Sequence, residues 1–289
     1  MKKHPRHFRL GTTSFIYPGR IIPNVKRLGP VVDEIELLVF ESRPYKGMDV
    51  LPSRGEVDEL AQLSRELDLS YNVHLPVDLD ITDPAQRDGA AGTLARVVDL
   101  MAPLNPTTHT LHLPMDRALA RMARAASNGE GDLESRDREL GASLSAWREN
   151  ALAGMAILAD HIPDLGGITV ETLDYPPTLL DPILNAYPVG LCMDVGHHFK
   201  YDFDPARGFL AWGDRIPLIH LHGVAKREGK IRDHIGLDHL DGPRREALIP
   251  LLADFTGTLS LEVFSLENLN GSLGALAPYF EGIAAPLDP

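Results

Sequence analysis

The sequence has a single cysteine and lacks an apolar run long enough to cross a bilayer. One cysteine excludes an internal disulfide framework, so Cys192, in an apolar run before Asp194, is expected to pack in the core. The basic start MKKHPRHFRLGTTSF has no apolar segment of the kind that a secretory signal carries. We therefore expect a cytoplasmic protein that makes no use of a membrane.

Positive charge is also scarce, because 28 Lys and Arg stand against 41 Asp and Glu, a net charge of −13. Binding to nucleic acid draws mainly on Lys and Arg that contact phosphates, so a long nucleic acid is disfavoured as a partner. A small-molecule substrate is expected instead. The sequence does not indicate an oligomeric state.

Short apolar runs alternate with helical patterns along the chain. In the range 56–69, Val57, Leu60 and Leu63 recur at the spacing of one helix face. Runs such as IELLVF show no polar alternation, which is typical of strands buried on both faces. The pattern predicts an α/β fold, a (β/α)8 TIM barrel formed by a single domain over 1–289. The expected strands are 7–13, 34–40, 70–75, 107–113, 167–172, 189–194, 216–222 and 257–264, and the expected helices include 56–69, 90–101, 143–162, 176–185, 204–212, 243–254 and 267–281.

One expected connection is unusually long. Residues 115–142 include ASNGEGDLESRDREL, which is rich in glycine and charge. Long loops of this kind are either functional covers or mobile insertions. The sequence leaves both alternatives open.

Imidazole and carboxylate side chains stand at or near the ends of most expected strands. The carboxyl ends of the strands of a closed parallel barrel face one way, so these groups are expected to meet in one pocket. For a single carboxylate the alternative is a cap on the following helix, where the dipole favours negative charge. Together the groups predict a site for two or three divalent ions, Zn²⁺ or Mn²⁺, with Fe²⁺ a further candidate. The predicted ligands are His74, His112, Glu171, Asp194, His197, His220, His234 and Glu262.

Further polar groups are expected to border this pocket as substrate contacts. They comprise hydroxyls at the end of the first strand, a carboxylate after the second, and a histidine on the same strand face as His220. A cation in the segment VAKREGKIRDHIGLDHL would hold a phosphate, although a solvated loop is the alternative for that segment. The predicted substrate-binding residues are Thr12, Thr13, Ser14, Glu41, His222 and Arg232.

Two further positions carry expectations. Glu36 lies inside an apolar run, where an unpaired carboxylate is costly, so a buried partner such as a His or an Arg is expected. Gly196, between Asp194 and His197, is expected to permit a tight bend after its strand.

This pattern resembles the xylose-isomerase-like barrel superfamily, which includes sugar isomerases, epimerases and the endonuclease IV type of abasic-site nuclease. For the epimerases, the resemblance implies one metal held by a Glu, Asp, His and Glu set. For the nuclease branch, it implies added histidines and several metals. One departure is that Asp233 and His234 are adjacent, where that branch has Asp-x-His, which puts the third metal in doubt. The epimerase set matches Glu171, Asp194, His220 and Glu262, and the added histidines match His74, His112 and His197.

The opening FRLGTTSFIYPGRIIPNVKRLGPVVDEIELLVFES, with NVHLP, THTLHLP, VETLDYP, DVGHH, IHLHG and SLEVFS, further resembles the cobamide-remodelling phosphodiesterases of the CbiR family. The resemblance implies a metal-dependent hydrolase that cleaves the phosphodiester of the cobamide nucleotide loop. Glu171 and Glu262 are then expected to be catalytic, by bridging metals or accepting a proton. The alternative is a metal-dependent sugar or sugar-phosphate isomerase or epimerase, in which the same two residues would move a proton beside a carbonyl. A binding module without activity is a third possibility.

Overall fold

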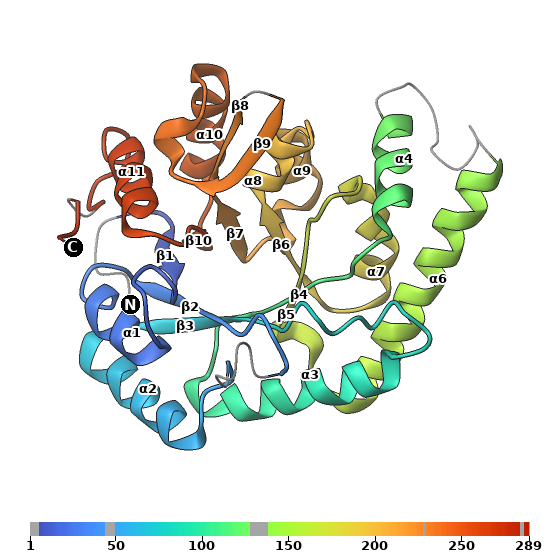
Figure 1. The fold of residues 1–289 in the computed structure, drawn as a ribbon, viewed down its shortest axis with the longest axis horizontal. Helices are drawn as coiled ribbons and strands as arrows, with labels where there is room; N and C mark the ends of the chain where they lie inside the picture. Colours follow the sequence, from blue (N-terminus) through green and yellow to red (C-terminus); the bar gives the residue numbers. More distant parts are fainter. Residues whose placement is uncertain (1–5, 44–49, 128–137, 228, 284–285, 289) are drawn as a thin grey trace.

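The computed structural model of the protein describes residues 6–43, 50–127, 138–227, 229–283 and 286–288. Eight parallel strands close into a barrel, and the chain visits them in spatial order, so that the last strand pairs with the first (Figure 1). The predicted TIM barrel is therefore confirmed, with every expected strand present. The barrel strands are β1 (Arg9–Thr13), β2 (Glu34–Leu38), β3 (Ser70–His74), β4 (His109–Leu111), β5 (Ile168–Glu171), β6 (Gly190–Asp194), β7 (Leu218–Leu221) and β10 (Thr258–Leu261).

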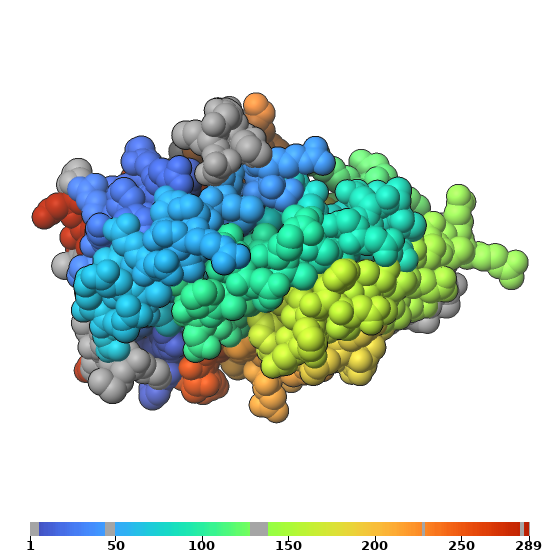
Figure 2. Space-filling view, turned by 90° about the horizontal axis from the view of Figure 1, so that it is seen from below, coloured from blue at the N-terminus to red at the C-terminus, as the bar shows by residue number. Residues whose placement is uncertain are grey.

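Helices pack around the outside of the barrel, and Figure 2 shows α2, α3 and α6 side by side across one face. Their apolar sides face the strands, as expected from apolar residues that recur in the sequence with a period of 3.6. Among the described residues, no helix is both long and apolar enough to span a membrane. The helices are α1 (Ile21–Leu28), α2 (Arg54–Leu67), α3 (Arg87–Met101), α4 (Arg117–Ser127), α6 (Arg138–His161), α7 (Asp181–Ala186), α8 (Val195–Lys200), α9 (Pro205–Trp212), α10 (Gly242–Asp254) and α11 (Leu266–Leu276).

Helix α2 shows how local sequence sets these elements. Ser53 caps its start by accepting a hydrogen bond from the backbone N–H of Glu56, and the Glu56 carboxylate accepts from the backbone N–H of Ser53. This reciprocal capping box satisfies amide donors that a helix start leaves unpaired. Val57, Leu60 and Leu63 are buried, as their spacing predicts.

The charged segment after β7 forms a two-stranded antiparallel hairpin, which the sequence analysis did not predict. Its strands are β8 (Gly223–Arg227) and β9 (Lys230–Ile235), and they stand above the barrel mouth beside α8 (Figure 1). Gly229 adopts φ of 76° between them, a conformation that favours glycine. The hairpin brings the far end of β9 back toward the end of β7.

The expected long connection 115–142 is largely helical at its two ends. Helix α4 covers 117–127, and α6 begins at Arg138, earlier than the expected helix 143–162. Residues 128–137 lie outside the described residues. A lid or a mobile insertion over 115–142 therefore stays a prediction.

The packing of α6 against the loop after β3 gives a first testable prediction. A Cβ on Gly154 would lie 2.1 Å from the carbonyl oxygen of Ile81. We expect Gly154→Ala to lower the free energy of unfolding by about 1–3 kcal/mol, because a buried backbone must shift. Gly89→Ala in α3 is the matched control, since a Cβ there meets nothing within 4 Å. Urea unfolding measures both, and a Gly154→Ala protein as stable as the control would contradict this packing.

Candidate metal centre

The carboxyl ends of six barrel strands and the hairpin bring histidines and carboxylates together in overlapping groups. Within each group the ligand atoms lie within 4.8 Å of one another. Three of the groups are a central one of Glu171, Asp194, His220 and Glu262, a second of His74, His112 and Glu171, and a third of Asp194, His197, His222 and His234; a further one joins Glu171 and His220 to buried Cys192.

The central group stands on four consecutive strands of the barrel. Asp194 and His220 are register partners across β6 and β7. His220 Nδ1 lies 3.3 Å from Glu262 Oε2 and 3.6 Å from Glu171 Oε2. All four side chains are buried, so the carboxylates have little contact with solvent.

The second group places two imidazoles on one oxygen of Glu171. His74 Nε2 lies 3.3 Å and His112 Nε2 3.0 Å from Glu171 Oε2. His74 Nδ1 lies 3.0 Å from the carbonyl oxygen of Leu75, which can only accept a hydrogen bond. Neutral His74 therefore carries its proton on Nδ1 and turns the lone pair of Nε2 toward a carboxylate. That arrangement requires either a second proton on the ring or a cation between the two groups.

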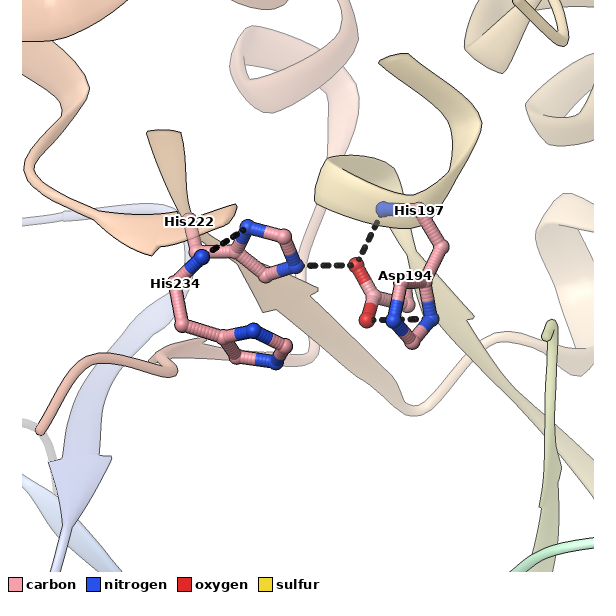
Figure 3. A group of neighbouring side chains, drawn as sticks. All are labelled: Asp194, His197, His222 and His234. Atoms are coloured by element: carbon pink, nitrogen blue, oxygen red, sulfur yellow. Dashed lines mark hydrogen bonds and ion pairs between the residues drawn. The ribbon is translucent and has the colours of Figure 1, made fainter. Parts of the chain in front are cut away.

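The third group lies under the hairpin (Figure 3). His197 Nδ1 is 2.8 Å from Asp194 Oδ2, and His222 Nε2 is 3.4 Å from Asp194 Oδ1. The rings of His222 and His234 stack at 4.0 Å between centroids. His222 Nδ1 accepts from the backbone N–H of His234 at 3.0 Å and lies 3.2 Å from the carbonyl oxygen of Gly223. While Nδ1 accepts this bond, neutral His222 carries its proton on Nε2, toward Asp194. Nε2 is free as a ligand in the other tautomer, in which Nδ1 donates to Gly223 and the His234 N–H gives up this acceptor.

Gly196 makes the third group possible, although not through a bend. It lies in α8, and a Cβ there would come within 2.3 Å of the His222 ring. Glycine is needed because the imidazole packs directly on the helix backbone. The expected reason, a tight turn, is thus replaced by close approach of a side chain.

Unpartnered atoms support the idea that these groups hold cations. Among the described residues, Asp194 Oδ2, His220 Nδ1, His222 Nε2 and Glu262 Oε2 are buried and have no hydrogen-bond partner. Burying a polar atom without a partner costs about 1–3 kcal/mol, so such atoms are rare in native proteins. A divalent cation among them would satisfy several at once, and this mixture of imidazole nitrogen and carboxylate oxygen suits Zn²⁺, Mn²⁺ or Fe²⁺.

The charges of the groups are strongly coupled. Burial acts to raise the pKa of Glu171, but His112 and His74 hold it far below its ordinary value. Burial disfavours the cationic form of His197, yet Asp194 raises its pKa to about 9. In the same way Asp233 and Glu262 outweigh burial and raise the pKa of His234 to about 10. Without metal, protons on His197 and His234 therefore balance part of the buried negative charge.

The three hydroxyls predicted to contact substrate are engaged with the backbone. The hydroxyls of Thr12 and Thr13 donate to the carbonyl oxygens of Leu261 and Val263, and Ser14 Oγ accepts from the backbone N–H of Leu38. All three side chains are buried, and these bonds tie β1 to its neighbours. These hydrogen bonds hold β1 against its neighbours, and contact of the three residues with substrate stays a prediction.

The other two predicted substrate contacts line pockets of their own. Glu41 lines a separate pocket with Arg20 and Ser53, beside α2. Arg232 is exposed on β9 and lines a pocket with His239 at the start of α11. Neither is brought to the donor groups, so their part in substrate binding stays a prediction.

The structure also brings His222 to the donor groups. The sequence analysis assigned it to substrate, whereas the structure places it among the donors of the third group. The two-residue spacing in the HLH motif places His222 on the same strand face as His220, and this spacing is the sequence signal for a shared site. Asp233 is not a member of the third group: one of its oxygens pairs with Lys200, and the other lies 3.7 Å from His234 Nδ1.

Comparison with known proteins agrees with the fold. A family model described as "Xylose isomerase-like TIM barrel" matches residues 22–279. The chain belongs to this family. The family is enzymatic, and it commonly uses divalent metals, although neither the identity nor the number of ions in this protein follows from membership.

Solved structures resemble the chain along nearly its whole length. A D-tagatose 3-epimerase-like protein has 17% identity and a TM-score of 0.67, with 94% of this chain and 97% of that chain covered. D-allulose 3-epimerase from Methylomonas sp. has 17% identity and a TM-score of 0.53, covering 90% and 85%. A 3-keto-D-glucoside 4-epimerase from E. coli has 13% identity and a TM-score of 0.58, covering 94% and 98%. At these identities the likeness concerns the fold alone.

No curated protein matches the sequence. The expected superfamily is therefore confirmed, while the narrower likeness to cobamide-remodelling phosphodiesterases finds no support in these comparisons. The names of the similar structures are mostly those of sugar epimerases and isomerase-like proteins.

The raised pKa values predict proton release when metal binds. At about pH 7.5 metal-free His234 and His197 hold protons, because their pKa values are about 10 and 9. A histidine must lose that proton to become a ligand, so Zn²⁺ binding should release protons and strengthen as pH rises. Calorimetric titration in buffers of different ionisation enthalpy counts them, and His234→Asn should release about one fewer. Exposed His239 supplies the control His239→Asn; equal proton counts in all three proteins would contradict the assignment.

Proposed function

We propose that the protein is a metal-dependent hydrolase that cleaves a phosphodiester with two or three divalent cations. The observation that carries this proposal is the sharing of carboxylates between donor groups. Glu171 belongs to the central and second groups, and Asp194 belongs to the central and third groups. Carboxylates shared in this way suit neighbouring cations that act on one substrate.

Bound cations would supply positive charge to phosphoryl oxygens and lower the pKa of water, which is the chemistry that phosphodiester hydrolysis needs. The protein would contribute a fixed and largely dry set of ligands. Glu262 is the candidate proton acceptor, because its buried Oε2 has no hydrogen-bond partner among the described residues. Glu171, held between His112 and His74, is better suited to join neighbouring cations.

The substrate that we propose is the phosphodiester of the cobamide nucleotide loop. Its support is the resemblance of the opening block and the strand-end motifs to the CbiR family. The net charge of −13 weighs against long nucleic acid as the natural phosphodiester. A cytoplasmic location fits a small-molecule substrate of this kind and is part of the proposal.

A second candidate is a sugar or sugar-phosphate epimerase or isomerase, and the comparisons favour it. Most of the similar solved structures carry such names. In this candidate the central group alone would hold one cation, and Glu171 and Glu262 would exchange a proton with the substrate. The second and third groups would then have no metal to hold.

The two candidates give opposite results for His112→Asn. His112 belongs only to the second group, so a multi-metal hydrolase should lose one bound ion. Its activity should fall about 100-fold or more, since even the loss of an outer partner of a ligand costs about 10–100-fold. An epimerase should keep its single ion, so the metal stoichiometry separates the two candidates; its activity is no discriminator, because His112 also contacts Glu171. Elemental analysis gives the stoichiometry, with His239→Asn as the exposed control.

Activity on the proposed substrate tests the chemistry directly. We expect a cobamide to be split into a corrinoid phosphate and a riboside, which chromatography separates. Asp194→Asn should reduce the rate below detection while circular dichroism stays unchanged, because Asp194 serves two donor groups. Exhaustive chelation should also abolish the reaction and added metal should restore it. Full activity after chelation would rule out the proposal, and turnover of ketoses alone would establish the second candidate.

A further inference from the structure

Glu36 is a buried carboxylate one layer below the central donor group. It lies in the middle of β2, and its side chain is 0% exposed. Its Oε2 accepts a hydrogen bond from Ser260 Oγ at 2.7 Å, and its Oε1 lies 2.9 Å from His220 Nε2. The buried partner expected from the sequence is thus His220, a residue of the central group.

The two ring nitrogens of His220 face different carboxylates. Nε2 faces Glu36, while Nδ1 faces Glu262 and Glu171. Among the described residues neither Nε2 nor Glu36 Oε1 has a hydrogen-bond partner of good geometry, and their 2.9 Å approach is the ion-pair contact found for both atoms. A proton on Nε2 therefore leaves the lone pair of Nδ1 directed at the donor group.

We propose that Glu36 is a positioning residue that fixes the tautomer and the basicity of His220 for metal binding. Metal-ligating histidines commonly donate their second N–H to a carboxylate, which orients the ring and makes it a stronger ligand. Ser260 completes the arrangement, because its hydroxyl occupies Oε2 and leaves Oε1 for the imidazole. Ser260 is the register partner of His220 in the adjacent strand, so the barrel itself holds the three residues in place.

This proposal adds a residue to the description of the metal centre. It rests on the proposed function only in that both need bound metal. It does not depend on which reaction the metal serves. A protein that binds metal but never cleaves a phosphodiester would overturn the proposed function and leave the role of Glu36 intact.

Glu34 provides a matched control on the same strand. It is also 0% exposed and lies two residues away, on the same face of β2. Its carboxylate is held by Arg9, Ser70, Asn72 and Thr107, all outside the donor groups. Glu34→Gln therefore removes an equivalent buried charge without touching a metal ligand.

The test is metal affinity, measured by competition with a chromophoric chelator, together with the absorption spectrum of Co²⁺. We expect Glu36→Gln to weaken Zn²⁺ binding about 10–100-fold and to alter the Co²⁺ bands. Ser260→Ala should weaken Zn²⁺ binding by a smaller factor. It replaces Glu36→Gln as the test variant if Glu36→Gln fails to fold. Glu34→Gln should lower the melting temperature and keep the affinity of the parent protein.

A double-mutant cycle asks whether Glu36 acts through His220. In a His220→Asn background, Glu36→Gln should cause no further loss of affinity, because the ring that it orients is gone. An affinity of Glu36→Gln within about twofold of the parent protein would overturn the proposal. An equal loss in Glu34→Gln, or a full further loss in the His220→Asn background, would also overturn it, since either result indicates a general structural effect.

Discussion

Balance of buried negative charge is the constraint on which this protein depends. Glu36, Glu171, Asp194 and Glu262 lie inside or at the mouth of the barrel, each nearly removed from solvent. Like charges at such depth cannot coexist without nearby positive charge. His197 and His234 supply it as protons when metal is absent, and divalent cations would supply it otherwise.

The two ends of the barrel meet this constraint in different ways. At the amino-terminal end, Asp33 and Glu34 are paired with Arg6 and Arg9, whose charge is permanent. At the mouth, the ion-pair partners of Glu171, Asp194 and Glu262 are imidazoles, which can be neutral and can bind metal. Permanent pairs stabilise the barrel, whereas exchangeable ones make a site. The same physical problem is thus solved for stability at one end and for chemistry at the other.

Family membership leaves the reaction open because the central group serves both kinds of chemistry. One cation beside Glu171 and Glu262 suits proton transfer on a sugar, and several suit phosphate esters. What separates them here is the surroundings of the central group, namely His74 and His112 on one side and the histidines under the hairpin on the other. The hairpin β8–β9 matters most, because it carries His234 onto the ring of His222.

The sequence by itself determined the barrel and the composition of its mouth. Apolar runs that end in a polar residue are a local signal. Closure of a parallel barrel makes the carboxyl ends of its strands neighbours, independently of the loop conformations. Only the tertiary structure decided where each polar atom is used. The hydroxyls of Thr12 and Thr13 donate hydrogen bonds to the backbone of the adjacent strand. His222 lies among the donors because Gly196 leaves space for its ring. These outcomes depend on strand register and on contacts between segments distant in the chain, which no local pattern of residues encodes.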